Sequence, residues 1–301
     1  MDTSTREINV KQQALSVCTI AYRRAKVRLL CCPDMYQYWP TRKITMTHFI
    51  RLALIVAGLM AGCTTGFDTG LQGQIATKNT EFMLSFDDGP LPDETGRVLE
   101  LLATLKAIDG TPVKAGFFLL ADAPDEFWQR RLYYAPYEFW ADKGSIAKYP
   151  GVARRIKQAG HTIGNHTVRH PWFQWPWLDT PEAVLDELTG WEVIAQAVLG
   201  QTNSRLFRPP YFILTATVRE TATRLGYQIV MGESSGDAMP GVTVNEIKQN
   251  TQAILAAWHK PYPCLLVFHD NRPTTYRHLD DIVSYLQQRG FRLVHFDPKR
   301  L

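Results

Sequence analysis

The sequence predicts an α/β protein in which strands and helices build one closed or nearly closed (β/α)7 barrel, similar to a TIM barrel. Beyond residue 80, short apolar runs typical of strands alternate with longer segments whose apolar residues recur at helical spacing. A barrel of such units carries its functional loops at the carboxyl ends of the strands. The first strand lacks the glycine-rich phosphate-binding turn of the alternative fold, an open doubly wound sheet.

Seven strands are expected, at residues 81–86, 113–120, 161–164, 205–208, 227–231, 264–269 and 291–296. Six helices are expected between them, at residues 94–107, 151–159, 181–199, 216–225, 244–258 and 276–289. The helix at 181–199 has apolar residues at a 3.6-residue period, with Thr180 as its N-cap and Pro181 as its first residue. Gly160, Gly226 and Gly290 each follow a helix, as capping glycines do.

The amino-terminal segment differs in charge from the rest of the chain. Residues 1–51 carry nine Lys and Arg against three Asp and Glu, whereas residues 63–301 carry 24 against 26. The basic excess is therefore local, and we expect no nucleic-acid partner.

Of the five cysteines, only Cys63 and Cys264 lie at or beyond residue 63, which excludes a disulfide framework there. Cys264 is expected to be a buried small apolar residue.

Residues 46–62 have the layout of a lipoprotein-type signal peptide. Arg51 precedes an apolar run, and Ala61 and Gly62 stand directly before Cys63, an arrangement that resembles a bacterial lipobox. This resemblance implies a protein anchored in the bacterial cell envelope through a lipid on Cys63, facing the periplasm or the exterior. The alternatives are an ordinary cleaved signal or a short anchor helix.

Two further segments flank this leader. Residues 1–45 are expected to be a non-native upstream extension or disordered, with translation starting at Met46, since a signal peptide stands at the start of its chain. Residues 63–79 are expected to be a polar tether, and residues 80–301 are expected to form a single domain. Residues 121–149 interrupt the alternation of strands and helices and are rich in aromatic residues. They predict either a wall on which sugar rings stack or a satellite cluster packed on the barrel.

Two adjacent carboxylates end the first strand. Asp87 and Asp88 follow a short apolar run and precede Gly89-Pro90, which breaks the strand. Because successive side chains of a strand point to opposite faces, the two acids need not share one function. The pattern suggests a metal ligand beside a general base; an Asp-rich turn is the alternative.

A pair of histidines follows the third strand. His166 and His170 are four residues apart, so on a helical turn they would lie on one face and could chelate a metal. With Asp88 they provide two imidazoles and one carboxylate, which suits Zn²⁺ first and Co²⁺, Ni²⁺ or Fe²⁺ as alternatives. An accidental or core pair of histidines is the other interpretation.

Four more polar residues stand at or after later strand ends. Arg208 opens Arg-Pro-Pro-Tyr, whose prolines stiffen the turn, so its guanidinium could pair with Asp87. His269 ends the strand at 264–269 and is a candidate general acid. Asp237 and Glu233 follow the strand at 227–231, and either could pair with His269 and raise its pKa.

Taken in order, Ser-Phe-Asp-Asp-Gly-Pro, His-Thr-Val-Arg-His, Arg-Pro-Pro-Tyr and the apolar strand into His269 resemble polysaccharide deacetylases of carbohydrate esterase family four, the NodB-homology domain. The resemblance covers about residues 80–298. It implies a distorted seven-stranded barrel and metal-dependent removal of acetyl groups from N-acetylated sugars.

The resemblance also implies a role for each matching residue. Asp88, His166 and His170 would bind the metal, Asp87 would be the general base, and Arg208 would orient Asp87. The Tyr211 backbone N–H would stabilise the oxyanion, and His269, tuned by Asp237, would protonate the leaving amine. Leu266 and Val267 would line the pocket for the acetyl methyl group.

Two positions depart from the family pattern. Phe212 stands where the family commonly has glycine, and Asp237 is followed by Ala238 where the family commonly has tryptophan.

The expected substrate is an N-acetylglucosamine-containing glycan: peptidoglycan, a chitin-like polymer or poly-N-acetylglucosamine. The alternatives are an O-acetyl esterase acting on an acetylated xylan-type polysaccharide and an inactive lipid-anchored glycan-binding protein. We expect a monomer.

Overall fold

The computed structural model describes residues 80–200 and 205–301, within one compact unit that spans Gln74–Leu301. The predicted upstream extension, signal peptide, lipid-bearing Cys63 and tether therefore lie outside the described residues. Among the residues that are described, no helix combines the length and apolar character needed to cross a membrane.

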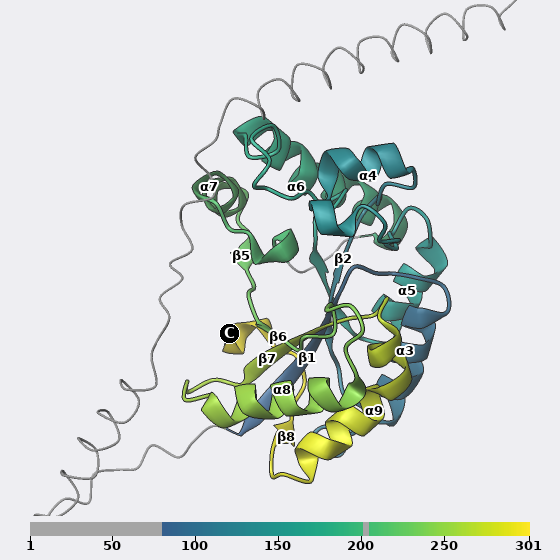
Figure 1. Cartoon of the computed structure of the whole chain (residues 1–301), viewed down its shortest axis with the longest axis vertical. Helices are drawn as coiled ribbons and strands as arrows, with labels where there is room; N and C mark the ends of the chain where they lie inside the picture. Colours follow the sequence, from purple (N-terminus) through teal and green to yellow (C-terminus); the bar gives the residue numbers. More distant parts are fainter. Residues whose placement is uncertain (1–79, 201–204) are drawn as a thin grey trace, which may run out of the picture. The chain divides into compact units, whose positions relative to one another are not determined.

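Eight strands form one sheet in which each strand pairing is parallel. The strands are β1 (Glu81–Asp87), β2 (Gly116–Leu119), β3 (Thr162–Asn165), β4 (Leu206–Phe207), β5 (Gln228–Ile229), β6 (Glu233–Ser234), β7 (Cys264–His269) and β8 (Arg292–Leu293). Their order is β5-β4-β3-β2-β1-β7-β6, with β8 also pairing β1. Because β5 and β6 are the two ends of this order, the curled sheet is an incomplete barrel (Figure 1).

Helices surround the sheet (Figure 1). They are α3 (Glu94–Thr104), α4 (Phe127–Tyr133), α5 (Pro150–Gln158), α6 (Pro181–Leu199), α7 (Ala216–Arg224), α8 (Val244–Ala257) and α9 (Pro273–Gln287). Neighbouring helices contact one another in the order α8, α9, α3, α5, α6, α7, which follows the order β6, β7, β1, β2, β3, β4 of the strands that precede them. This is the arrangement of consecutive right-handed βα units, and it confirms the predicted fold class.

The six predicted helices are all present, and α6 has the predicted bounds with Thr180 as its N-cap. The capping glycines Gly160, Gly226 and Gly290 have φ of 78°, 76° and 86°, the left-handed conformation that glycine adopts without strain. The prediction missed α4 and β6, and it made several strands too long. β6 has two residues, Glu233–Ser234, which is too few to show a strand periodicity.

Two apolar layers lie on the two faces of the sheet. The interior layer fills the barrel with Met83, Phe118, Leu206, Val230, Leu265, Val294 and Phe296. The larger layer packs the sheet against the helices and includes Leu266. Because side chains alternate along β7, Leu266 points to the helices, while Val267 shares the face of Leu265 and His269. The predicted place of Leu266 in an acetyl pocket is therefore wrong. Cys264 is a buried free thiol, as predicted.

We predict that Leu188→Ala, in the buried face of α6, lowers the free energy of unfolding by about 2–5 kcal/mol, since it leaves a cavity in the core. Val193→Ala is the matched control, because Val193 lies on the same helix and is 70% exposed; it should change stability by less than about 0.5 kcal/mol. Urea unfolding of both variants measures the difference. Equal losses of stability would contradict the placement of α6.

Candidate functional site

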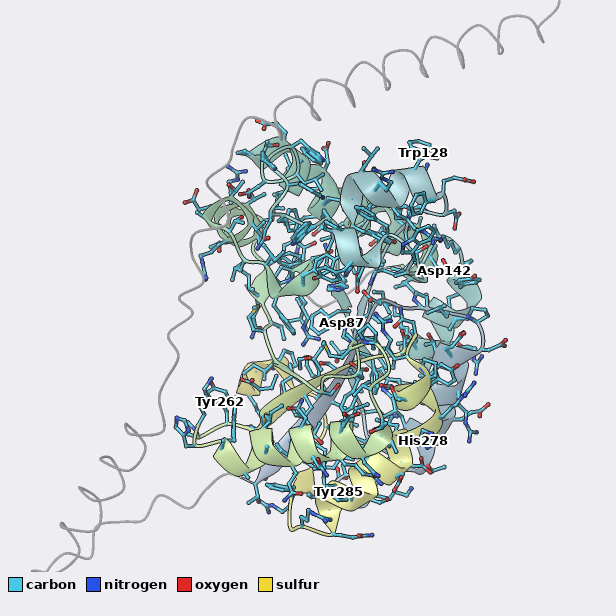
Figure 2. The ribbon with its side chains drawn as sticks, viewed as in Figure 1. Asp87, Trp128, Asp142, Tyr262, His278 and Tyr285 are labelled. Atoms are coloured by element: carbon cyan, nitrogen blue, oxygen red, sulfur yellow. The ribbon has the colours of Figure 1, made fainter. Side chains whose placement is uncertain are left out.

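The predicted site residues gather where the strands end. Asp87 is the last residue of β1 and His269 the last residue of β7, and the parallel register pairs their Cα atoms. His166 directly follows β3, and Arg208 directly follows β4. Asp87 lies near the middle of the described part of the chain in Figure 2. The carboxyl edge of the sheet therefore brings together the groups that the motifs predicted.

Asp88, His166 and His170 form a buried set of three potential metal ligands whose ligand atoms lie within 4.8 Å of one another. Asp88 Oδ1 is 3.6 Å from His166 Nε2 and 3.1 Å from His170 Nε2. Within residues 80–200 and 205–301, this oxygen makes no hydrogen bond. A buried carboxylate oxygen without a hydrogen bond is costly, and a cation would satisfy it.

The orientation of His166 also fits a metal. Its Nδ1 lies 2.8 Å from the carbonyl oxygen of Arg208, so Nδ1–H donates to that oxygen and Nε2 keeps a free lone pair. Such a hydrogen bond is the usual support of a metal-bound histidine. Two imidazole nitrogens and one carboxylate oxygen are a donor set that suits a divalent transition metal, so the residues present fit the metal that the motifs imply.

The two histidines do not lie on a helical turn, and this expectation is wrong. Thr167 and His170 have φ of 75° and 60°, outside the right-handed helical region. Side chains hold the turn instead: Asn165 Oδ1 accepts from the Thr167 N–H at 2.7 Å, and the Thr167 hydroxyl accepts from the His170 N–H at 3.1 Å. Side-chain-to-backbone bonds of this kind compete with helix formation.

Glu187 fixes the same turn from α6, and the motif search missed it. Its Oε2 accepts from the backbone N–H groups of Val168 and Arg169 at 2.9 and 2.8 Å, and its Oε1 accepts from the Arg169 guanidinium at 2.7 Å. Burial raises the pKa of Glu187, and Arg169 opposes this effect. An acid directly before Leu188, on the buried face of the helix, is the sequence signal that could have found it.

Arg208 and Asp87 form the predicted ion pair. Arg208 Nη1 lies 2.6 Å from Asp87 Oδ1 and 3.0 Å from the Ser85 hydroxyl. Its Nε donates to the carbonyl of Val230 at 3.1 Å, and its guanidinium carbon lies 3.9 Å from the centroid of the Phe118 ring. The buried guanidinium has no freedom to turn, so it fixes the direction of the Asp87 carboxylate.

Left-handed backbone conformations cluster at this site. Asp88, Tyr211 and Phe212 have φ of 74°, 58° and 56°, in addition to Thr167 and His170 in the histidine turn. Non-glycine residues in this region are strained, and such residues concentrate at functional sites. The conformation of Phe212 explains why glycine commonly stands at this position in the family, since glycine adopts it without strain.

His269 pairs with Asp237 rather than with Glu233. Asp237 Oδ1 lies 2.8 Å from His269 Nδ1, and Oδ2 accepts from the His269 N–H at 2.7 Å and from the Thr275 hydroxyl at 2.6 Å. Burial lowers the pKa of His269, but the nearby Asp237 carboxylate outweighs this and raises it to about 9. Glu233 lies in β6 instead, where it pairs in register with Leu266 of β7.

The 121–149 insertion contributes two kinds of side chain. Tyr134 is buried with its ring 5.7 Å from that of His170, which fits the satellite cluster. Tyr137 is 72% exposed and lies 6.2 Å from Tyr211, whose ring in turn lies 4.5 Å from His170. The Tyr211 hydroxyl accepts from the Ala135 N–H at 3.1 Å, which ties the insertion to the site. Stacking of sugar rings on the exposed aromatic residues stays a prediction.

Lys143, also from the insertion, is a site residue that no motif indicated. Its side chain is fully buried, and its Nζ donates to Asp88 Oδ2 and lies 3.2 Å from Glu138 Oε2. Burial lowers the pKa of Lys143, but Asp88 and Glu138 outweigh this and raise it. Conversely, burial would raise the pKa of Asp88, but Lys143 and the two histidines hold it well below its ordinary value.

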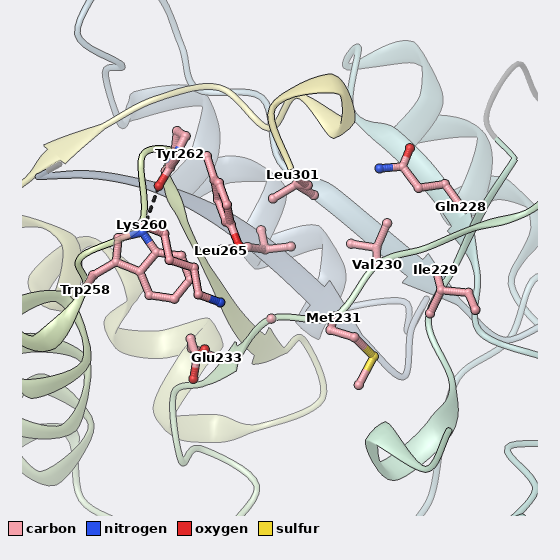
Figure 3. Close-up of a pocket in the computed structure, with 12 residues that line it drawn as sticks. Gln228, Ile229, Val230, Met231, Glu233, Trp258, Lys260, Tyr262, Leu265 and Leu301 are labelled. Carbon is pink, nitrogen blue, oxygen red and sulfur yellow. Dashed lines mark hydrogen bonds between the residues drawn. The ribbon is translucent and has the colours of Figure 1, made fainter. Parts of the chain in front are cut away.

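A separate cavity of about 240 Å³ lies where β5 and β6 fail to pair (Figure 3). Its lining includes Gln228 at the start of β5, Leu265 near the start of β7, and Trp258, Lys260 and Tyr262. None of the eight predicted site residues lines it. Val230, which lines it, accepts a hydrogen bond from Arg208 Nε through its backbone carbonyl.

Comparison with known proteins identifies the family. The polysaccharide deacetylase family model matches residues 74–230, which is more than half of the chain. The chain therefore belongs to the polysaccharide deacetylase family, and the resemblance seen in its motifs is confirmed.

Individual relatives are enzymes of this kind. A chitin deacetylase from Pestalotiopsis sp is 31% identical over 60% of this chain and 53% of its own length. A peptidoglycan-N-acetylglucosamine deacetylase from Bacillus cereus is 24% identical over 71% of this chain and 66% of its own length. The chain thus spans between half and two thirds of the length of these curated relatives.

Solved structures share the fold. The Bc1960 peptidoglycan N-acetylglucosamine deacetylase superposes with a TM-score of 0.57 at 24% identity, covering 74% of this chain and 88% of that chain. A family 4 acetyl xylan esterase from Clostridium thermocellum, in complex with a cobalt ion, gives a TM-score of 0.52 at 22% identity, covering 71% and 87%.

We predict that the His269 imidazole titrates with a pKa near 9 and that Asp237→Asn lowers this pKa, because burial would then act without the opposing carboxylate. NMR titration of the imidazole nitrogens measures both values. Glu233→Gln, which removes the other candidate partner, should leave the pKa of His269 unchanged. A larger shift in Glu233→Gln than in Asp237→Asn would contradict the pairing.

Proposed function

We propose that this protein is a metal-dependent hydrolase that removes N-acetyl groups from an N-acetylglucosamine-containing polysaccharide and releases acetate. One observation carries the proposal: the buried Asp88–His166–His170 ligand set lies directly beside a carboxylate that an arginine orients. The names of the relatives support the substrate class, since they are deacetylases of chitin and of peptidoglycan. The cobalt ion of the structurally similar esterase supports a divalent metal.

Asp88, His166 and His170 would hold the metal, with Zn²⁺ as the first candidate. When bound, the metal would supply Lewis-acid chemistry, polarising the acetyl carbonyl and increasing the acidity of the attacking water. Asp87 would accept the proton of that water through Oδ2, because Arg208 occupies its Oδ1. Asp87 Oδ2 lies 4.0 Å from His166 Nε2, so the base faces the centre that the ligands define.

His269 would act as the general acid for the leaving amine. Its pKa of about 9 keeps the imidazole protonated at neutral pH, and Asp237 holds Nδ1, so Nε2 is the nitrogen that donates. The amine of an amide leaves readily only after protonation, which favours N-acetyl over O-acetyl substrates. The Tyr211 backbone N–H is the proposed donor to the oxyanion.

The proposal includes the place of action. The signal-peptide pattern and the lipobox-like end at Cys63 support a lipid anchor at the bacterial cell envelope. Acylation of the full-length chain, lost in Cys63→Ser, is the observation that tests this part of the proposal.

We predict that Asp87→Asn lowers the rate of acetate release by about 10²–10⁴-fold, because a positioned base contributes this much, while the variant retains its metal. Acetate release from N-acetylglucosamine oligomers and peptidoglycan, together with metal analysis of the purified protein, measures both effects. His166→Ala is the contrasting variant and should lose the metal. Near-normal turnover in Asp87→Asn would contradict its role as the base.

The same assay separates the alternatives. Release of acetate from acetylated xylan but not from N-acetylglucosamine oligomers would identify an O-acetyl esterase. Binding of these glycans without any acetate release from the metal-loaded protein would identify a glycan-binding protein.

A further inference from the structure

We propose that Lys143 determines how Asp88 binds the metal: it occupies Oδ2, so that Asp88 offers only Oδ1, and its charge weakens the affinity of the centre for the metal. Lys143 is thus a positioning residue that acts through Asp88. The inference rests on the proposed function for the identity of the metal centre.

The two oxygens of the Asp88 carboxylate have different surroundings. Oδ2 accepts a hydrogen bond from Lys143 Nζ, whereas Oδ1 makes no hydrogen bond in the part of the chain that the structure describes. Oδ1 is also the oxygen that lies near both histidine Nε2 atoms, at 3.6 Å for His166 and 3.1 Å for His170. Oδ2 of Asp88 therefore bonds the lysine, whereas Oδ1 faces the position of the metal.

Backbone contacts of the 121–149 insertion place Lys143 beside Asp88. The Gly144 N–H donates to the carbonyl oxygen of Asp88 at 3.1 Å, and Ile146 N–H donates to the carbonyl of Leu120 at 2.9 Å, next to the end of β2. A Cβ atom on Gly144 would lie 1.9 Å from the carbonyl oxygen of Pro90, so only glycine allows this approach. The close approach brings the neighbouring Lys143 against the carboxylate.

The surroundings keep the lysine in place. Its Nζ lies 3.2 Å from Glu138 Oε2 and 5.7 Å from the centroid of the Tyr134 ring. Glu138 also lies 3.5 Å from an Arg272 nitrogen, so this acid is shared between two cations. A buried ammonium group is costly unless it is paired, and here Asp88 is its closest partner.

Two consequences follow for a bound metal. A carboxylate in which one oxygen accepts a hydrogen bond from a lysine binds a metal through the other oxygen alone, which keeps the coordination number low. The ammonium group is also a positive charge one carboxylate away from the metal, and like charges repel more strongly inside a protein than in water.

Titration of the full chain with Co²⁺ tests the inference, since the intensity of the visible absorption of Co²⁺ falls as its coordination number rises. In Lys143→Met we expect weaker absorption per bound ion, because Asp88 can add Oδ2, and a Kd lower by about tenfold or more. Arg131→Met is the matched control, since Arg131 belongs to the same insertion and is exposed, with its guanidinium over the Phe127 ring. It should match the wild-type chain in both measurements.

A second variant covers the case in which Lys143→Met does not fold. Lys143→Met with Glu138→Gln removes both charges of the adjoining pair and frees Oδ2 in the same way, and it should give the same two changes. Glu138→Gln alone keeps the lysine and should retain the wild-type spectrum.

An unchanged spectrum and Kd in the folded Lys143 variants would overturn the inference, as would weaker Co²⁺ binding. Absence of Co²⁺ binding in the wild-type chain would overturn it together with the proposed metal centre. These measurements need no turnover. The predicted changes without acetate release from any glycan would support the role of Lys143 while contradicting the proposed function.

Discussion

The carboxylate of Asp88 is buried beside a lysine and two histidines, and the arrangement of the site depends on keeping its charge compensated there. Removing an ionised carboxylate from water is costly unless partners surround it. Lys143 supplies that partner from the 121–149 insertion, and the turn after β3 brings the two histidines to the opposite oxygen. The insertion is therefore part of the site and not only a cover on the barrel.

The same solution recurs at three other buried acids. Asp87 pairs with Arg208, Asp237 with His269, and Glu187 with Arg169. Each pair joins two different segments of the chain, so the ion pairs connect the loops at the carboxyl edge of the sheet. Each of these carboxylates is paired with its own cationic side chain. Neighbouring carboxylates can therefore keep different chemical roles.

Short sequence patterns predicted the helices and the fold class, because these features depend on interactions between residues close together in the sequence. Alternating strand and helix periods, the capping glycines and the Thr180 cap all depend on neighbouring residues, and they gave the fold class and the bounds of α6. The motifs at the strand ends predicted the ligand set, because parallel strands bring their carboxyl ends to one edge.

What remained unpredicted depends on specific side-chain contacts, which no periodic pattern in the sequence encodes. The histidine turn is not helical because the side chains of Asn165 and Thr167 bond its backbone, and Glu187 supports it from α6. Lys143 lies 55 residues from Asp88 in sequence, in a segment without a regular period, so no spacing rule could have joined them. The departure at Phe212 was visible in the sequence, but its left-handed conformation was not.

Anomalous diffraction from crystals of the zinc-loaded protein tests the metal centre most directly. The expected result is one anomalous peak bonded to Asp88 Oδ1 and to a nitrogen of each of His166 and His170, at about 2.0–2.2 Å, with Lys143 still bonded to Oδ2. A zinc ion bound by other residues, or crystals in which these three side chains hold no metal at saturating zinc, would contradict this assignment.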